Sequence, residues 1–213
     1  MTDLILTATI ETIYMVSFST LIAVLLGFPL GMVLVMTRKN GISENIKLYT
    51  FLDGIINLMR SIPFIILVLV LFPLSRLLVG TTIGTKAVIV PLSISATPFV
   101  ARMFEQAVIE VDKGVIDAAK AMGSSKREIL LKVLIPEALP SLVNMITITI
   151  INVIGYSAMA GAIGGGGLGD VAIRYGHFRS ETDVLWASVI VIVILVQIVQ
   201  FVGTRISIIL NKR

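Results

Sequence analysis

The sequence predicts an all-α membrane protein with five transmembrane helices, and three features support this prediction. The 213 residues are 56% hydrophobic and only 14% charged, and their mean hydropathy is +1.01. A typical soluble domain has about 25% charged residues, so this chain has too few charges to cover a soluble globule. Long apolar runs recur along it, and each span needs about 20 such residues. Five spans leave only short loops and no room for a separate soluble catalytic domain.

The charge pattern places the spans in order along a single transmembrane domain, residues 1–213. The spans are predicted at about 12–37, 48–75, 87–109, 138–163 and 184–205. The first span follows from the charge-free run between Glu11 and Arg38, which is too long for the core of a signal peptide. The fourth lies in the charge-free run 138–169. Between the third and fourth spans, residues 110–132 form the longest polar stretch.

Orientation follows from the distribution of Lys and Arg, which favours the cytoplasmic loops. One side would hold Arg38, Lys39, Lys47, Lys113, Lys120, Lys126, Arg127, Lys132, Arg205, Lys212 and Arg213. The other would hold Arg76, Lys86, Arg174 and Arg179. The first set should face the cytoplasm, which places the N-terminus outside and the C-terminus inside. The excess of 17 basic over 13 acidic residues is thus explained by topology, and we expect no nucleic-acid partner.

Several kinds of chemistry are excluded by composition. Cysteine is absent and His177 is the single histidine, which leaves no disulfide, no cysteine nucleophile and no multi-histidine metal site within one chain. No G-x-x-x-x-G-K-[ST] motif is present, so the chain cannot hold ATP in a P-loop. The glycines at 164, 166 and 169 fit G-x-G-x-x-G, but they follow a membrane span and not a strand. They predict a tight turn at the external end of the fourth span, which either borders the pore or the dock of a binding protein, or is purely structural.

The cytoplasmic loop predicts a short amphipathic helix. Val115, Ala119 and Met122 recur at helical spacing, and Gly123 suits a helix end in the left-handed conformation. Ser125 and Glu128 match a capping box that opens a new helix. A short helix with small residues on its surface either docks in a groove of a partner or rests on lipid headgroups.

This loop resembles the EAA loop of binding-protein-dependent ABC importer permeases. That pattern reads Glu-Ala-Ala, three residues, Gly, nine residues and Ile-x-Leu-Pro. The matching residues here are Asp117, Ala118, Ala119, Gly123 and Val133-Leu134-Ile135-Pro136. Asp117, Val133 and Ile135 depart from the pattern but keep its charge or apolar character. The segments 60–64 (RSIPF), 155–159 (GYSAM) and 164–169 (GGGGLG) look like the methionine-importer branch of this family.

The resemblance implies an ABC type I importer permease fold in the bacterial inner membrane. It implies a homodimer of this chain and two cytoplasmic ATP-binding subunits that hold ATP and magnesium, so this chain would carry no cofactor. An external methionine-binding lipoprotein and membrane lipid complete the expected partners. The amphipathic helix would be the coupling helix that seats in the ATP-binding subunit. The implied coupling residues are Val115, Asp117, Ala118, Ala119, Met122 and Gly123.

The fourth span is the candidate wall of a translocation path. Asn144, Thr147 or Thr149, and Asn152 can share one stripe, and Tyr156 continues the polar run. A polar stripe inside a membrane usually faces a cavity or another helix. Met159 either plugs a narrow pore between two copies of the chain or packs in the ordinary way.

Two further patterns predict internal contacts. Asp53 and Arg60 share one face of the second span and predict either an ion pair, with Glu105 or Glu137 as additional partners, or a substrate contact. Arg102 and Glu105 lie near the cytoplasmic end of the third span, where snorkelling explains them. Two G-x-x-x-G pairs, at 27/31 and at 161/165, predict close helix packing.

Three functions remain open from the sequence. The first is the permease subunit of an ATP-driven importer, for methionine or for another small amino acid. The second is an autonomous channel or facilitator, which would leave the 113–128 helix without a purpose. The third is a membrane-embedded enzyme, for which no cluster of catalytic side chains at one depth is found.

Overall fold

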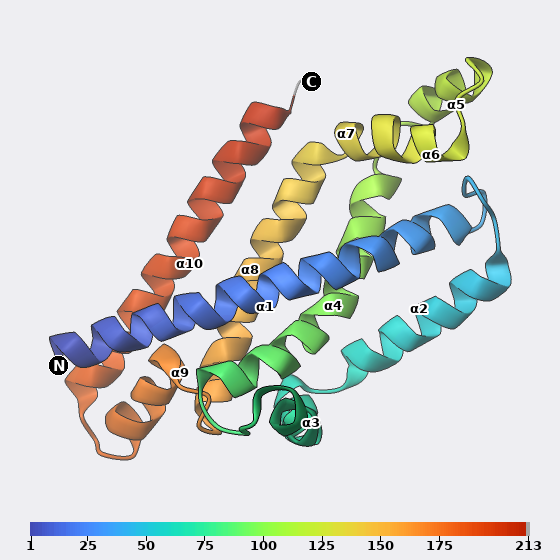
Figure 1. Cartoon of the computed structure of the whole chain (residues 1–213). Helices are drawn as coiled ribbons and strands as arrows, with labels where there is room; N and C mark the ends of the chain where they lie inside the picture. The colour runs from blue at the N-terminus through green and yellow to red at the C-terminus, as the bar shows by residue number, and fades with distance from the viewer. Residues whose placement is uncertain (212–213) are drawn as a thin grey trace.

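The computed structural model describes residues 1–211, and every regular element in that range is a helix (Figure 1). Lys212 and Arg213, which the charge count assigned to the cytoplasmic side, lie outside the described residues. The long helices are α1 (Thr2–Thr37), α2 (Ile46–Ser61), α3 (Phe64–Val79), α4 (Thr85–Ile109), α8 (Leu139–Gly161) and α10 (Thr182–Leu210). The short elements are α5 (Lys113–Ala121), α6 (Lys126–Glu128), the π-helical turn η1 (Ile129–Leu134), α7 (Ile135–Glu137), α9 (Gly167–Val171) and the π-helical turn η2 (Ala172–His177).

The structure supports an all-helical membrane protein with four or five candidate spans. Within residues 1–211, four helices are long and apolar enough to cross a membrane: α1, α4, α8 and α10. The bent pair of α2 and α3 makes a fifth span when it is counted as one. Helix α1 begins ten residues before the predicted first span, and α10 continues five residues beyond the predicted fifth.

The predicted second span is not one continuous helix. Helices α2 and α3 meet at an angle of 104°. Pro63 precedes α3, and Ile62 before it is extended, with φ −81° and ψ 123°. The proline ring disfavours the helical conformation for the residue before it, and Pro63 has no backbone N–H to continue the ladder of α2. The Ile-Pro pair therefore ends one helix and starts another in a new direction.

Helix α1 lies diagonally across α10, α8 and α4, and its closest packing is against α4 (Figure 1). A Cβ added at Gly27 would lie 2.7 Å from the Thr97 carbonyl oxygen, and one at Gly31 would lie 2.8 Å from the Ala101 carbonyl oxygen. The G-x-x-x-G pair at 27/31 therefore packs α1 against the backbone of α4, as predicted. The second pair is similar, because Gly161 is pressed against the backbone of Gly169.

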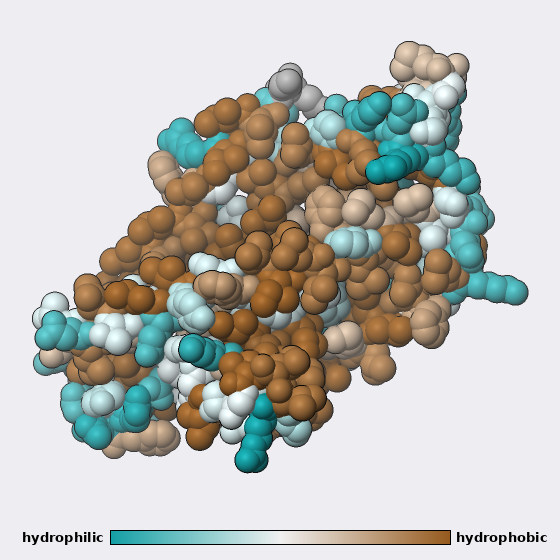
Figure 2. Space-filling model, viewed as in Figure 1, coloured by the Kyte–Doolittle hydropathy of each residue, from teal (hydrophilic) through white to brown (hydrophobic). Residues whose placement is uncertain are grey.

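The outer surface is apolar along the middle of the molecule. Figure 2 shows hydrophobic residues over most of this view, with hydrophilic residues gathered near α5 and the α1–α2 loop, and again near the N-terminus and α9. Helix α10 is the most exposed span, with 11% of its most apolar window buried. A broad apolar belt between two polar ends is the surface expected of a protein solvated by lipid tails.

The α1–α4 contact gives a test of the fold. We expect Gly31→Ala to lower the stability of the detergent-solubilised protein by about 1–3 kcal/mol, because the added methyl meets the backbone of α4 and overpacks it. The control is Gly54→Ala on α2, where a Cβ would have open space within 4 Å and alanine improves helix propensity. Thermal denaturation of the two variants measures the difference. Equal stability would contradict the close α1–α4 packing.

Candidate functional site

The predicted coupling helix forms as α5, and its ends are fixed by local hydrogen bonds. Asp112 caps its start, where the carboxylate accepts from the Gly114 N–H at 2.6 Å. At its end, Gly123 adopts φ +77°, a conformation that glycine reaches without steric cost. The Ser124 N–H donates to the Ala119 carbonyl at 3.1 Å and closes the helix. The predicted helix end at Gly123 is confirmed.

The predicted capping box is also present. The Glu128 N–H donates to the Ser125 hydroxyl at 3.3 Å, and the Ser125 N–H donates to the Glu128 carboxylate at 3.1 Å. Hydrogen bonds from Ser125, and then the charge and hydrogen bond of Lys132, lower the pKa of Glu128 from 4.5 to about 2. A lowered pKa stabilises the folded loop above pH 4.5, and this contribution is lost as the pH falls towards 2. The box is therefore intact at neutral pH.

The six predicted coupling residues divide between an exposed face and a buried one. Val115, Ala118 and Met122 are exposed and follow one another at spacings of three and four, so they form one apolar stripe. Asp117 and Gly123 are also exposed. Ala119 is only 2% exposed and belongs to the main core cluster, so it packs inwards and is not available to a partner. Helix α5 projects at one end of the molecule (Figure 1).

The predicted stripe on α8 splits into two sets. Asn144 and Met159 are exposed and Asn152 is partly exposed, on a face that also includes Ile148 and Gly155. We call this set of five residues the α8 face.

The other two predicted path residues point elsewhere. Thr147 is buried, and a Cβ added at Gly203 of α10 would meet its side chain. The Tyr156 ring stacks on Phe64 of α3, with ring centroids 4.6 Å apart. Sequence spacing predicted that α8 is a helix. It could not separate the side chains that pack between helices from those that are exposed on the surface of this chain.

The prediction of an Asp53–Arg60 ion pair is wrong, and Arg60 is exposed. The Asp53 carboxylate pairs with Arg102 of α4. The same guanidinium binds Glu105 at 2.6 Å, and the Tyr49 hydroxyl donates to Glu105 at 3.0 Å. Arg102 and Glu105 therefore do not snorkel independently. Arg102 takes an acidic partner from another helix, because a charge at membrane depth is costly without one.

The glycine-rich segment forms the tight turn that was predicted, and it is held by two residues that sequence reasoning missed. Gly164, Gly166 and Gly167 all have positive φ angles. The Glu11 carboxylate accepts from the Gly167 N–H at 2.8 Å, and the Thr12 hydroxyl accepts from the Leu168 N–H at 2.9 Å. The start of α9 is thus capped from α1. A glutamate at the boundary of a span was the available signal.

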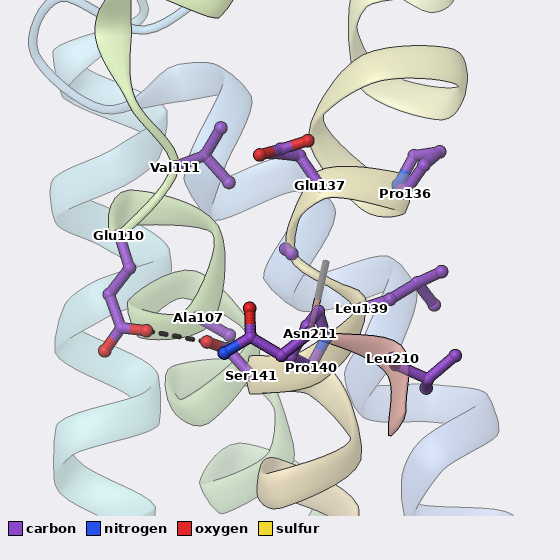
Figure 3. Close-up of a pocket in the computed structure, with 11 residues that line it drawn as sticks. Ala107, Glu110, Val111, Pro136, Glu137, Leu139, Pro140, Ser141, Leu210 and Asn211 are labelled. Atoms are coloured by element: carbon purple, nitrogen blue, oxygen red, sulfur yellow. Dashed lines mark hydrogen bonds between the residues drawn. The ribbon is translucent and has the colours of Figure 1, made fainter. Parts of the chain in front are cut away.

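A cavity of about 520 Å³ lies where α4, α7, α8 and α10 end or begin. Figure 3 shows Glu110 of the α4 end directed towards Ser141 of α8, and the Ser141 hydroxyl donates to its carboxylate at 2.7 Å. Glu137 and Asn211 also line the cavity. This cavity lies between the end of α4 and the start of α8, and no sequence pattern predicted it. Within residues 1–211, no group of three His, Cys, Asp or Glu side chains could hold a metal ion.

The end of α5 can be tested in the isolated subunit. We expect Gly123→Val to loosen α5, because a β-branched residue at φ +77° is strained by about 1–2 kcal/mol. Hydrogen exchange of amides 113–124 should become faster. Ser124→Ala is the matched control, since it retains the backbone hydrogen bond to Ala119. Unchanged protection in the valine variant would show that the end of α5 does not depend on this glycine.

Comparison with known proteins agrees with this geometry. The family model described as "Binding-protein-dependent transport system inner membrane component" matches residues 23–213. The chain is 49% identical to the probable D-methionine transport system permease protein MetI of Vibrio cholerae, over 94% of this chain and 89% of the relative. It is 44% identical to the methionine import system permease protein MetP of Bacillus subtilis, over 97% and 93% of the two chains.

Solved structures give the same result. A chain of the MetNI methionine ABC transporter in an inward-facing conformation superposes with a TM-score of 0.97 and 44% identity, covering 100% of this chain and 98% of the other. A more distant structure, an amino acid ABC transporter with histidines, shares the fold at a TM-score of 0.74 and 20% identity. With its length matched almost completely by the family model, this chain belongs to the family of binding-protein-dependent transport system inner membrane components.

Proposed function

We propose that this chain is the permease subunit of an ATP-driven methionine importer in the inner membrane. The observation that carries the proposal is end-to-end similarity, in sequence and in structure, to permeases named for methionine transport. Members of this family are transport subunits and not enzymes, so ATP and magnesium belong to a separate subunit. The chain contributes a path across the membrane and a lever that responds to the ATPase.

The lever is α5, and its exposed stripe is the surface for the ATP-binding subunit. Val115, Ala118 and Met122 present an apolar face with a small residue at its centre, which lets a partner backbone approach closely. The basic residues around this loop support a cytoplasmic position for it, where ATP is available. Two copies of this chain would bind two ATP-binding subunits, one at each α5.

The path is formed by pairing two copies of the chain around a twofold axis. The α8 face supports this arrangement, because amide groups at membrane depth need polar partners or water, and Asn144 is exposed there. Two facing α8 helices would give a path lined by amides, with Met159 at a narrow point. Closure of the ATPase dimer would move the docked α5 helices and switch the path from inward-facing to outward-facing.

The opposite end of the molecule would meet the methionine-binding lipoprotein. Turn η2 and the residues after it carry Tyr175 between Arg174 and Arg179, with guanidinium carbons 5.4 and 4.5 Å from the ring centroid. Phe178 beside them is 75% exposed. Exposed aromatic and arginine side chains together are typical of the central contacts of protein interfaces.

Docking of α5 is tested by Ala118→Arg. A charged, bulky side chain at the centre of the apolar stripe should weaken assembly with the ATP-binding subunit by about 2 kcal/mol or more, roughly thirtyfold in affinity. Co-purification and binding measurements on membranes that hold equal amounts of each variant check this result.

Lys120→Ala is the matched control on the same helix. Lys120 is exposed but lies on the side opposite the stripe, where it pairs with Asp117 at 3.3 Å. We expect near-normal assembly of this variant. Normal assembly of Ala118→Arg would remove the stripe as the docking surface.

The path is tested by the accessibility of introduced cysteines. The chain has no native cysteine, so any labelling of it reports the introduced thiol. Asn144→Cys on the α8 face should react with a charged, water-soluble thiol reagent in the assembled transporter, since only a thiol in contact with water forms the reactive thiolate readily. Thr149→Cys is the control, because Thr149 is fully buried. If neither cysteine reacted with the reagent, the α8 face would lie against lipid or protein and would not line a path.

The substrate and the class of transporter are separated by one experiment. Affinity purification from the native membrane, followed by mass spectrometry, should recover an ATP-binding subunit in equal amount and a lipoprotein that carries methionine. A lipoprotein carrying another small amino acid would keep the importer and change its substrate. Recovery of this chain alone in several detergents would favour an autonomous facilitator.

A further inference from the structure

Helix α2 is only loosely held by apolar packing. Of its 16 residues only Ile56 is buried, in a small cluster with Leu34 of α1 and Ala101 of α4. Phe51 and Leu58 are 65% and 68% exposed. At its start the Asn45 N–H donates to the Thr37 carbonyl of α1 at 2.9 Å, and at its end a 104° bend joins it to α3. Apolar packing therefore contributes little to holding α2 against α4.

The polar contacts of α2 are stronger, and they centre on one side chain of α4. Arg102 bridges Asp53 of α2 and Glu105 of its own helix, and Tyr49 of α2 donates to Glu105 at 3.0 Å. The side chains of Arg102 and Glu105 are 15% and 3% exposed. A planar guanidinium can bind two carboxylates at once, which a lysine ammonium does less well. We call these four residues the α2–α4 clasp.

The clasp lies close to the coupling helix. Arg102 is seven residues, about 10 Å, from the end of α4 at a rise of 1.5 Å per residue, and Asp53 is seven residues from the start of α2. Only residues 110–112 separate α4 from α5. A displacement of α5 therefore reaches the end of α4 directly, and the clasp is a contact through which it can pass from α4 to α2.

We propose that Arg102 is a positioning residue that couples α2 to the lever formed by α4 and α5, so that α2 moves with α5 during the transport cycle. This proposal rests on the proposed function of the chain as an importer permease. The clasp acts by keeping one distance, between α2 and α4, constant while the two helices move together. Without it, α5 would still respond to ATP, but part of its movement would be lost before it reached α2.

The first test measures coupling in the complete transporter, reconstituted in vesicles. Asp53→Asn removes the ion pair between the helices and leaves the Arg102–Glu105 pair in α4. We expect ATP consumed per methionine imported to rise about three- to tenfold. Tyr49→Phe should cause a smaller rise. The control is Gln200→Ala, which removes a hydrogen bond to Thr204 within α10 and should leave the ratio unchanged.

The second test measures the distance that the clasp is proposed to fix. Spin labels on Leu58→Cys and Gln106→Cys, both at exposed positions, report the α2–α4 distance, and dilution with unlabelled chain removes signals between subunits. The distribution should be narrow and equal in the nucleotide-free and vanadate-trapped ATP states. With Asp53→Asn it should broaden in the trapped state.

The outcomes separate the two proposals. A wild-type α2–α4 distance that changes between states, or an Asp53→Asn variant with unchanged coupling and an unchanged distance, would overturn the clasp. A variant with poor assembly but a normal ratio of ATP to methionine would also overturn it, because that is a purely structural role. Failure of the wild-type complex to import methionine contradicts the proposed function instead, while the spin-label distances still report on the clasp.

Discussion

The lack of water in the hydrocarbon core is the constraint on which this structure depends. A polar group there must find its partner inside the protein. Arg102 meets this demand with two carboxylates from two helices. The turn before α9 meets it with Glu11 and Thr12, which bind the free N–H groups at the helix start. In each case at least one partner comes from another segment, so satisfying a polar group also fixes one helix against another.

Between helices in lipid, close packing provides the attraction that the hydrophobic effect provides in water. Gly27 and Gly31 bring α1 against the backbone of α4, and Gly203 brings α10 against Thr147 of α8. Small residues allow such approach and the dispersion contacts that follow from it. The diagonal α1 then holds α4, α8 and α9 together, which explains how a chain with an apolar exterior keeps a defined shape.

The long apolar helices, helix α5 and its caps could be predicted because their signals are local. Charge-free runs, Gly123 and the Ser125–Glu128 pair each act within a few residues. The break at Ile62–Pro63 was a local signal too, but the apolar run around it concealed it. Other features depend on which helix lies alongside. They are the partner of Asp53, the burial of Ala119 and the division of the α8 side chains between exposed and packed positions. Helical periodicity gives the faces of a helix without naming the neighbour that covers each face.

The contacts between helices also explain how a small movement of α5 could act on the whole subunit. Helix α5 is stiffened at both ends, by Asp112 and by the hydrogen bonds at Gly123, and Ala119 fixes it to the core. It is connected to α4 by three residues and to α8 through the continuous run of α6, η1 and α7. Both connections meet at the cavity where Ser141 binds Glu110 (Figure 3). A push on α5 is therefore divided between α4, which carries the clasp, and α8, which carries the open face. Because packed helices shift as units and not as continuous springs, a rigid lever placed between these two helices is a physical means of changing both together.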